Sequence, residues 1–184
     1  ASVVFAASAP AALIERIRAN GHTVEPLNTA RRTPDLDRSR IWSVAEQHDD
    51  AAQVVDVAGD DFDVVIVDHY GLSAAWETHF SQRSRLLAID DLANRPHAAH
   101  IVTDQNWYGP GSNSRYDTLV GSDTVQLLGP RYAVLQRDYR RIVRQHPARF
   151  PPERLLVSFG GTDPGGETEK VLTALEDEEF DSLT

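Results

Sequence analysis

The sequence contains no cysteine among its 184 residues, which excludes disulfide bonds and cysteine-ligated zinc sites. Methionine is also absent, even at position 1, so we expect Ala1 not to be the natural start of the protein. No apolar run approaches the ~20 residues that span a membrane. The apolar start ASVVFAASAPAAL has no basic segment before it, which argues against a signal peptide. We therefore expect a cytoplasmic protein without a membrane span.

Positive charge is scarce as well, since 18 Lys and Arg residues stand against 28 Asp and Glu, giving a net charge of −10. This balance argues against a general nucleic-acid binder, which needs a basic footprint. Lys170 is the only lysine. An acidic surface poor in lysine is typical of proteins from a high-salt cytoplasm, where screening weakens the repulsion between like charges. Selection for GC-rich codons would favour arginine over lysine too.

Short apolar runs alternate with helical patterns, which predicts an α/β fold with a doubly wound parallel sheet. VVIV (64–67) and LLVSF (155–159) indicate strands buried on both faces. The predicted strands cover 2–7, 23–27, 63–69, 85–90, 100–105, TVQLLG and LLVSFGG. The predicted helices cover 10–20, 40–58, 73–82, 131–145 and 165–176, with 106–118 as a loop. One face of the second helix is expected to hold Ile41, Val44, Ala45, Ala52 and Val55.

The three prolines of RQHPARFPPER indicate a linker. We predict a Rossmann-like domain over 1–149, followed by the beginning of a second α/β domain over 150–184. One strand and one helix cannot close a core, so we expect the second domain to be incomplete.

Polar clusters follow three of the predicted strands: Asp68-His69-Tyr70, Asp90-Asp91 and Asp104-Gln105-Asn106. The carboxyl ends of parallel strands share one edge of the sheet, where ligands bind. We expect His69 to exchange a proton, Tyr70 to donate a hydrogen bond to a sugar or phosphate oxygen, and Asp68 to orient either one. The alternative is that these residues only cap helices or bond to backbone.

A metal site is not expected. Asp90 and Asp91 are adjacent in a strand, so their side chains point to opposite faces and rarely bind one ion together. His97 and His100 are three residues apart in a loop that contains proline, which is a weak spacing for a metal site.

The stretch LLVSFGGTDPGGETE turns from a strand through Gly160 and Gly161 into a helix expected after Thr162 or Asp163. Backbone N–H groups at such a helix start can bind an anion. The stretch is neither a Walker A motif nor G-x-G-x-x-G. Asp163 is unfavourable beside a phosphate unless it caps the helix, and an ordinary glycine turn is the alternative.

Five segments together resemble one family: VDHYGLSAAWE, LLAIDDLANRPH, DQNWYGPGSNSRY, LLGPRYAVLQRDY and LLVSFGGTDPGGETEKVLTAL. Their order and spacing over about residues 1–175 are similar to those of the pseudaminic-acid UDP-sugar hydrolases, which include spore-coat polysaccharide proteins of the SpsG type. The resemblance implies a GT-B fold of two α/β domains. It also implies hydrolysis of UDP-2,4-diacetamido-2,4,6-trideoxy-β-L-altropyranose, with inversion at the anomeric carbon and without a metal or cofactor.

By this resemblance Tyr70 matches an active-site tyrosine, and Gly160, Gly161 and Thr162 match the loop that opens the second domain towards the nucleotide. The remaining candidates lie in matching motifs: Asp68 and His69 as catalytic residues, and Asp90, Asp91, Asn106 and Asp163 as substrate-binding residues. The family's first strand and Gly-His loop, with its expected general base, have no counterpart here, and His22 is not assigned that role. Alternatives are a glycosyltransferase that uses a UDP-sugar donor and a non-catalytic sugar-nucleotide-binding protein.

Overall fold

The computed structural model describes residues 2–28, 40–141, 154–159, 163, 165–175 and 182–183. The chain divides into two compact units, Ala1–Leu135 and Gln136–Thr184. The predicted domain boundary between 149 and 150 lies outside the described residues.

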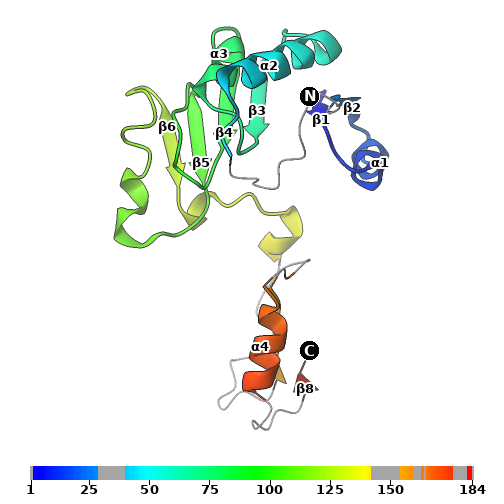
Figure 1. Ribbon diagram of the computed structural model, residues 1–184, viewed down its shortest axis with the longest axis vertical. Helices are drawn as coiled ribbons and strands as arrows, with labels where there is room; N and C mark the ends of the chain where they lie inside the picture. The colour runs from blue at the N-terminus through cyan, green and yellow to red at the C-terminus, as the bar shows by residue number, and fades with distance from the viewer. Residues whose placement is uncertain are drawn as a thin grey trace. The chain divides into compact units, whose positions relative to one another are not determined.

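A parallel four-stranded sheet forms the centre of the first unit, in the order β3-β4-β5-β6 (Figure 1). Its strands are β3 (Val64–Asp68), β4 (Arg85–Ile89), β5 (Ile101–Asp104) and β6 (Val125–Leu128). Leu86 and Ala88 of β4 are each 1% exposed and belong to the same core as Trp76 and Phe80 of helix α3 (Ala74–Ser81). Strands alternate with helices along the chain, so the predicted α/β class with parallel strands is confirmed.

Helix α2 (Val44–Ala58) packs against α3, but with a different face from the predicted one. The predicted face is wrong, because all five of its residues are exposed: Ile41, Val44, Ala45, Ala52 and Val55. The buried residues are Gln47, Asp50 and Ala51. Two of these are polar yet belong in the interior, because their side chains bond to the start of α3 and to an indole N–H. A pattern of apolar residues alone does not predict such hydrogen-bond partners.

Helix α2 begins at a capping box, which supplies hydrogen-bond partners at the start of the helix. Ser43 Oγ accepts a bond from the Glu46 amide at 3.3 Å, and the Glu46 carboxylate accepts one from the Ser43 amide at 2.7 Å. Both partners are close in sequence, so this boundary is set locally.

A separate two-stranded sheet pairs β1 (Val4–Ala7) with β2 (Thr23–Pro26) in parallel, joined by α1 (Ala11–Ala19). Helix α2 contacts β1 and β2 as well as α3. The main-chain amide of Asn28 also donates to Gln53 of α2 at 2.8 Å. The two sheets of the first unit are therefore connected through this helix.

The apolar runs are less buried than predicted. Val64 and Ile66 are 56% and 64% exposed, whereas Val67 is 7% exposed, so β3 buries one face only. In the second unit Leu156 and Phe159 are also exposed. The expectation that both runs are buried on both faces is therefore wrong for the described structure.

The predicted helix over 131–145 is also wrong where the structure describes it. Two short 3-10 segments, Pro130–Tyr132 and Arg137–Arg141, stand in its place. Between them the Val134 amide donates to the side chain of Gln105 at 3.1 Å, and Ala133 has extended backbone angles. This tertiary bond uses an amide that a helix would have directed to its own carbonyl.

The second unit contains a parallel pair, β7 (Arg154–Leu155) with β8 (Ser182–Leu183), and helix α4 (Glu167–Ala174). Helix α4 begins later than the predicted start near Asp163. In the first unit, a 3-10 helix over Gly109–Ser114 occupies part of the predicted loop. Among the described helices, none has both the length and the apolar character to cross a membrane.

Candidate functional site

A cavity of about 230 Å³ lies at the carboxyl ends of β3, β4 and β5. Its lining residues are Asp68, Tyr70, Ile89, Asp90, Asp91, Thr103, Gln105 and Val134. The three strands are adjacent and parallel, so the residues that follow them meet at one edge. We call this cavity the strand-end cavity.

Tyr70 and Asp91 interact directly at the strand-end cavity. A hydrogen bond to the Asp91 carboxylate raises the pKa of Tyr70, and partial burial and the negative charges of Asp68 and Asp90 add to the rise. Tyr70 is 38% exposed. At neutral pH it is therefore a neutral phenol beside a carboxylate, able to hold a hydroxyl group or a water molecule.

Asp91 is held by the loop that follows β5. Its Oδ2 accepts a bond from the Asn106 side chain at 3.2 Å, and its main-chain carbonyl accepts one from the Tyr108 hydroxyl at 2.7 Å. Asn106 also lies 3.4 Å from that hydroxyl. Asp91 Oδ1 is buried and has no hydrogen-bond partner among the described residues. These contacts fix the position of Asp91 and leave its buried Oδ1 unsatisfied.

Asp90 is buried and saturated with partners. Its Oδ1 accepts from Arg95 at 2.7 Å, and its Oδ2 accepts from the Ala93 amide at 2.9 Å and the Tyr116 hydroxyl at 2.8 Å. Burial acts to raise the pKa of Asp90. The His97 ring 3.6 Å away, the bond from the Ala93 amide, the positive charge of Arg95 and the bond from Tyr116 together lower it. Asp90 is therefore an ionised anchor for the surrounding loops, although part of it lines the cavity.

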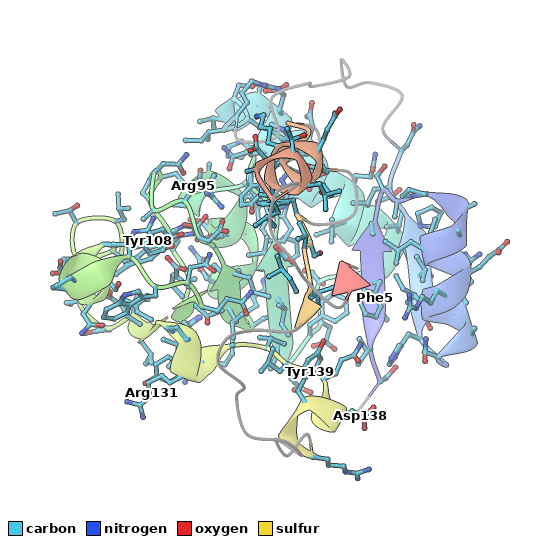
Figure 2. All side chains as sticks on the ribbon, turned by 90° about the horizontal axis from the view of Figure 1, so that it is seen from below. Phe5, Arg95, Tyr108, Arg131, Asp138 and Tyr139 are labelled. Carbon is cyan, nitrogen blue, oxygen red and sulfur yellow. The ribbon has the colours of Figure 1, made fainter. Side chains whose placement is uncertain are left out.

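Arg95, which is labelled in Figure 2, joins this anchor to the loop that carries Tyr70. Its Nε donates to the Leu72 carbonyl at 2.6 Å, and its Nη2 donates to the His69 carbonyl at 3.2 Å. The side chain of Arg95 is 2% exposed, and that of Asp90 is 0% exposed. A buried guanidinium thus holds both ends of the turn that presents Tyr70.

A second buried pair supports Asp90 from the side of α3. His97 Nδ1 lies 2.7 Å from Glu77 Oε1, and both side chains are 1% exposed. Burial lowers the pKa of His97, but the Asp90 carboxylate, 3.6 Å from Nε2, and the hydrogen bond to Glu77 outweigh it, so the pKa is raised. Tyr116 completes the cluster, and burial together with its bond to Asp90 raises the pKa of its phenol.

Arg115 stabilises the loops at the carboxyl end of β5, at the same edge of the sheet. It forms an ion pair with Asp104 and donates to the Asp91 carbonyl at 3.0 Å, and its guanidinium lies 3.5 Å from the ring centroid of Tyr108. Burial raises the pKa of Asp104 despite this cation. Asp104 Oδ1 also accepts from the Asn106 amide at 3.0 Å, so Asp104 shapes the loop that positions Asn106.

His69 stands apart from the strand-end cavity. Its Nδ1 accepts from the Gly71 amide at 3.0 Å, and its ring meets Trp42 edge-on at a centroid distance of 4.4 Å. The ring lines a different cavity, between β1 and β3. The structure therefore brings Asp68, Tyr70, Asp90 and Asp91 together, places Asn106 beside them, and turns His69 away.

No group of three or more His, Cys, Asp or Glu side chains in the described part of the chain could hold a metal ion. His100, three residues after His97, uses Nδ1 to accept a hydrogen bond from the Leu86 amide at 3.1 Å. The two histidines thus have separate structural partners.

In the second unit Asp163 caps helix α4. Its two carboxylate oxygens accept hydrogen bonds from the Glu167 and Thr168 amides, each at 2.9 Å. These bonds lower the pKa of Asp163, and those to Thr168 contribute most. Its carboxylate thus occupies donors that an anion would use at this helix start. Gly160, Gly161 and Thr162, the predicted nucleotide loop, lie outside the described residues.

Two cations of the site, the buried Arg95 and the partly buried Arg115, were not among the predicted site residues. Arg95 and Arg115 lie inside motifs quoted for the family resemblance, but nothing local distinguishes them from surface arginines. Glu77 resembles a solvent-facing residue of a helix, yet it is 1% exposed. A run of buried acids at strand ends does require compensating cations, and this requirement is the one signal that points to them.

No protein-family model matches this chain, and no curated protein matches it significantly. The resemblance to the UDP-sugar hydrolases therefore rests on the quoted motifs alone.

Proposed function

We propose that this chain is part of a UDP-sugar hydrolase of GT-B architecture, which releases UDP from a diacetamido-trideoxy sugar nucleotide with inversion at the anomeric carbon. One observation carries the proposal beyond the family resemblance: Asp68, Tyr70, Asp91 and Gln105 surround one cavity at the carboxyl edge of a parallel sheet. This edge is where open α/β sheets bind their ligands.

The chemistry of the strand-end cavity suits the sugar better than the diphosphate. Its charged lining residues are the acids Asp68, Asp90 and Asp91, which repel phosphate groups. Carboxylates accept hydrogen bonds from sugar hydroxyls and from acetamido N–H groups, and Gln105 and Tyr70 offer further polar atoms. We assign the sugar to this cavity, and the diphosphate to donors elsewhere in the protein.

Hydrolysis with inversion needs water held on the face of the anomeric carbon opposite the leaving UDP. Tyr70 is the group that we assign to hold the sugar or this water, because its phenol stays protonated beside Asp91. We assign Asp68, which is exposed at the end of β3, to orient the water. The resemblance puts the general base on a preceding glycine loop, which is not among these residues.

The proposal is tested by measuring UDP release from several UDP-sugars with the product of the complete gene, at high and low KCl. The panel contains the diacetamido-trideoxy sugar nucleotide and UDP-N-acetylglucosamine, and NMR follows the anomer of the product. Release without an acceptor, with the inverted anomer, is the expected result. Binding without release would contradict hydrolysis and favour a transferase or a binding protein.

Variants of the complete protein test the residues. Tyr70→Phe removes one hydrogen bond and is expected to lower turnover about 10-fold to 100-fold. Tyr139→Phe, an exposed tyrosine outside the cavity, is the matched control and is expected to leave turnover unchanged. If Tyr70→Phe and His69→Ala both leave turnover unchanged, neither residue takes part in the mechanism.

A further inference from the structure

A further cavity lies at the carboxyl end of β6, the last strand of the four-stranded sheet. Its volume of about 520 Å³ falls within the range of about 300–1,000 Å³ that small-molecule sites occupy. The loop after β5, the strand β6 and the turn after β6 all contribute to its lining. We call it the β6 cavity; its lining residues include Trp107, Ser112, Asn113, Gln126, Arg131 and Tyr132.

The charge of the β6 cavity is opposite to that of the strand-end cavity. Arg131, which is labelled in Figure 2, is the one charged residue among the described residues that line it. It forms no ion pair with any acid in the described part of the chain. Its guanidinium lies 5.0 Å from the ring centroid of Tyr132, which holds the cation at the cavity. In a protein of net charge −10, an unpaired cation in a cavity without acids favours an anionic ligand.

Trp107 gives the β6 cavity an open aromatic face. At 68% exposed it is the most exposed aromatic residue in the described part of the chain, whereas Trp76 is 5% exposed and Trp42 is partly buried. Tyr132 already faces a guanidinium, so the indole is the ring left open to a ligand. A flat ring stacked on Trp107 would remove apolar surface of both partners from water.

Hydrogen bonds fix the backbone around the β6 cavity. The Tyr108 amide donates to Ser112 Oγ at 2.8 Å, and that hydroxyl donates to the Gly109 carbonyl at 2.7 Å. On the other side, the Gly129 amide donates to the Asp104 carbonyl at 2.7 Å. Because both loops are held by their own bonds, a ligand that enters between them loses little affinity to ordering the protein.

Gln126 contributes an amide group to the β6 cavity. It precedes Leu128 by two residues on β6, so the two side chains share one face of the strand, and both line the cavity. Gln126 Oε1 has no hydrogen-bond partner among the described residues, and the terminal torsion of a glutamine amide is soft. The amide can therefore turn to pair with a ligand. Asn113, exposed on the loop after β5, supplies a second amide.

We propose that the β6 cavity binds a nucleoside phosphate. The base stacks on Trp107, the edge of the base pairs with the Gln126 amide, and the phosphate contacts Arg131. These three groups require a flat ring, an edge with donors and acceptors, and a negative charge in one ligand. A sugar acid has the charge but no flat ring, and inorganic phosphate has neither ring nor edge. A nucleic-acid strand is disfavoured by the net charge of −10.

This nucleotide site goes beyond the proposed function. In the described part of the chain, no residue lines both the β6 cavity and the strand-end cavity. The site is also distinct in sequence from Gly160, Gly161 and Thr162, which the family resemblance assigns to the nucleotide of the substrate. The β6 cavity is thus a second nucleotide site, and it is tested by binding, not by turnover. Either proposal can fail without the other.

Fluorine NMR on the complete gene product, labelled with fluorotryptophan, tests the site. Trp107→Phe identifies the resonance of Trp107 by removing it. The probes are UMP, AMP, uridine, inorganic phosphate and glucuronate. UMP or AMP is expected to shift the Trp107 resonance in a saturable way. Inorganic phosphate and glucuronate are expected to bind at least about 10-fold more weakly, because neither can stack on the indole.

Substitution of Arg131 tests the contact with the phosphate. Arg131→Ala is expected to weaken UMP binding about 10-fold, because a charged hydrogen bond is lost, and to leave uridine binding unchanged. Arg131 is exposed, so the variant is expected to fold. Arg16→Ala, at an exposed arginine of α1, is the matched control and is expected to leave the binding of both probes unchanged.

Three results would overturn the proposal. The first is a Trp107 resonance that neither UMP nor AMP shifts at concentrations up to about 10 mM. The second is a shift with glucuronate but not with the nucleotides, which would assign the cavity to sugar acids. The third is an Arg131→Ala variant that loses uridine and UMP binding equally, which would show that the cation does not contact the phosphate.

Discussion

Replacing Arg95 by methionine tests whether the buried Arg95–Asp90 pair holds the site together. Arg95 donates to Asp90, to the Leu72 carbonyl and to the His69 carbonyl, and all of its contacts are buried or partly buried. Methionine has a comparable length but no donors, so it leaves a buried carboxylate without its main cation. Removing one member of a buried ion pair costs about 3–5 kcal/mol of the free energy of unfolding.

Urea unfolding followed by tryptophan fluorescence measures this loss, since Trp76 lies in the core. With a slope of about 2 kcal/mol per molar urea, the midpoint is expected to fall by about 1.5–2.5 M. Arg83→Met is the matched control. Arg83 pairs with Asp60 at the surface, with 68% and 44% of the side chains exposed, and its loss is expected to cost below about 1 kcal/mol.

A double-mutant cycle isolates the pair itself. In an Asp90→Asn background residue 90 carries no carboxylate that could be left without its cation. Arg95→Met is therefore expected to lower the free energy of unfolding by at least about 1 kcal/mol less than it does in the wild type. Equal costs in the two backgrounds, or a cost in the wild type no larger than that of Arg83→Met, would refute the reasoning. Asp90 would then not depend on Arg95 for its charge compensation.

Two further predictions concern stability. The pKa of His97 is raised in the folded state, so its contribution to stability is complete below the unfolded pKa of about 6.5 and is lost as the pH rises through the folded pKa. In the wild type the urea midpoint should therefore fall between pH 6 and 9, and His97→Asn should make this fall smaller. An unchanged dependence on pH would contradict the pairing of His97 with Glu77. Gly71→Ala should lower the melting temperature, because a Cβ there would lie 2.5 Å from Trp42 Nε1, whereas Gly111→Ala has open space and should not; equal melting temperatures would refute the contact.

The sequence alone predicted the order of most strands and helices of the first unit. Apolar runs, glycines and caps act within a few residues, and the capping box at Ser43 is one such local feature. The same local logic placed Asp68, Asp90 and Asp91 at strand ends. Parallel strands then brought these ends to one edge, as expected from a general rule of α/β sheets.

Only the tertiary structure decided what each of these residues does. Asp90 and Asp91 are neighbours in sequence, yet Asp90 is saturated by Arg95 and Tyr116, while Oδ1 of Asp91 has no partner among the described residues. His69 follows Asp68 directly, yet its ring packs against Trp42. The prediction of which face of α2 is buried was wrong for the same reason. Hydrogen bonds and ion pairs between distant residues outweigh the local pattern, because a buried polar group must find its partner wherever the fold places one.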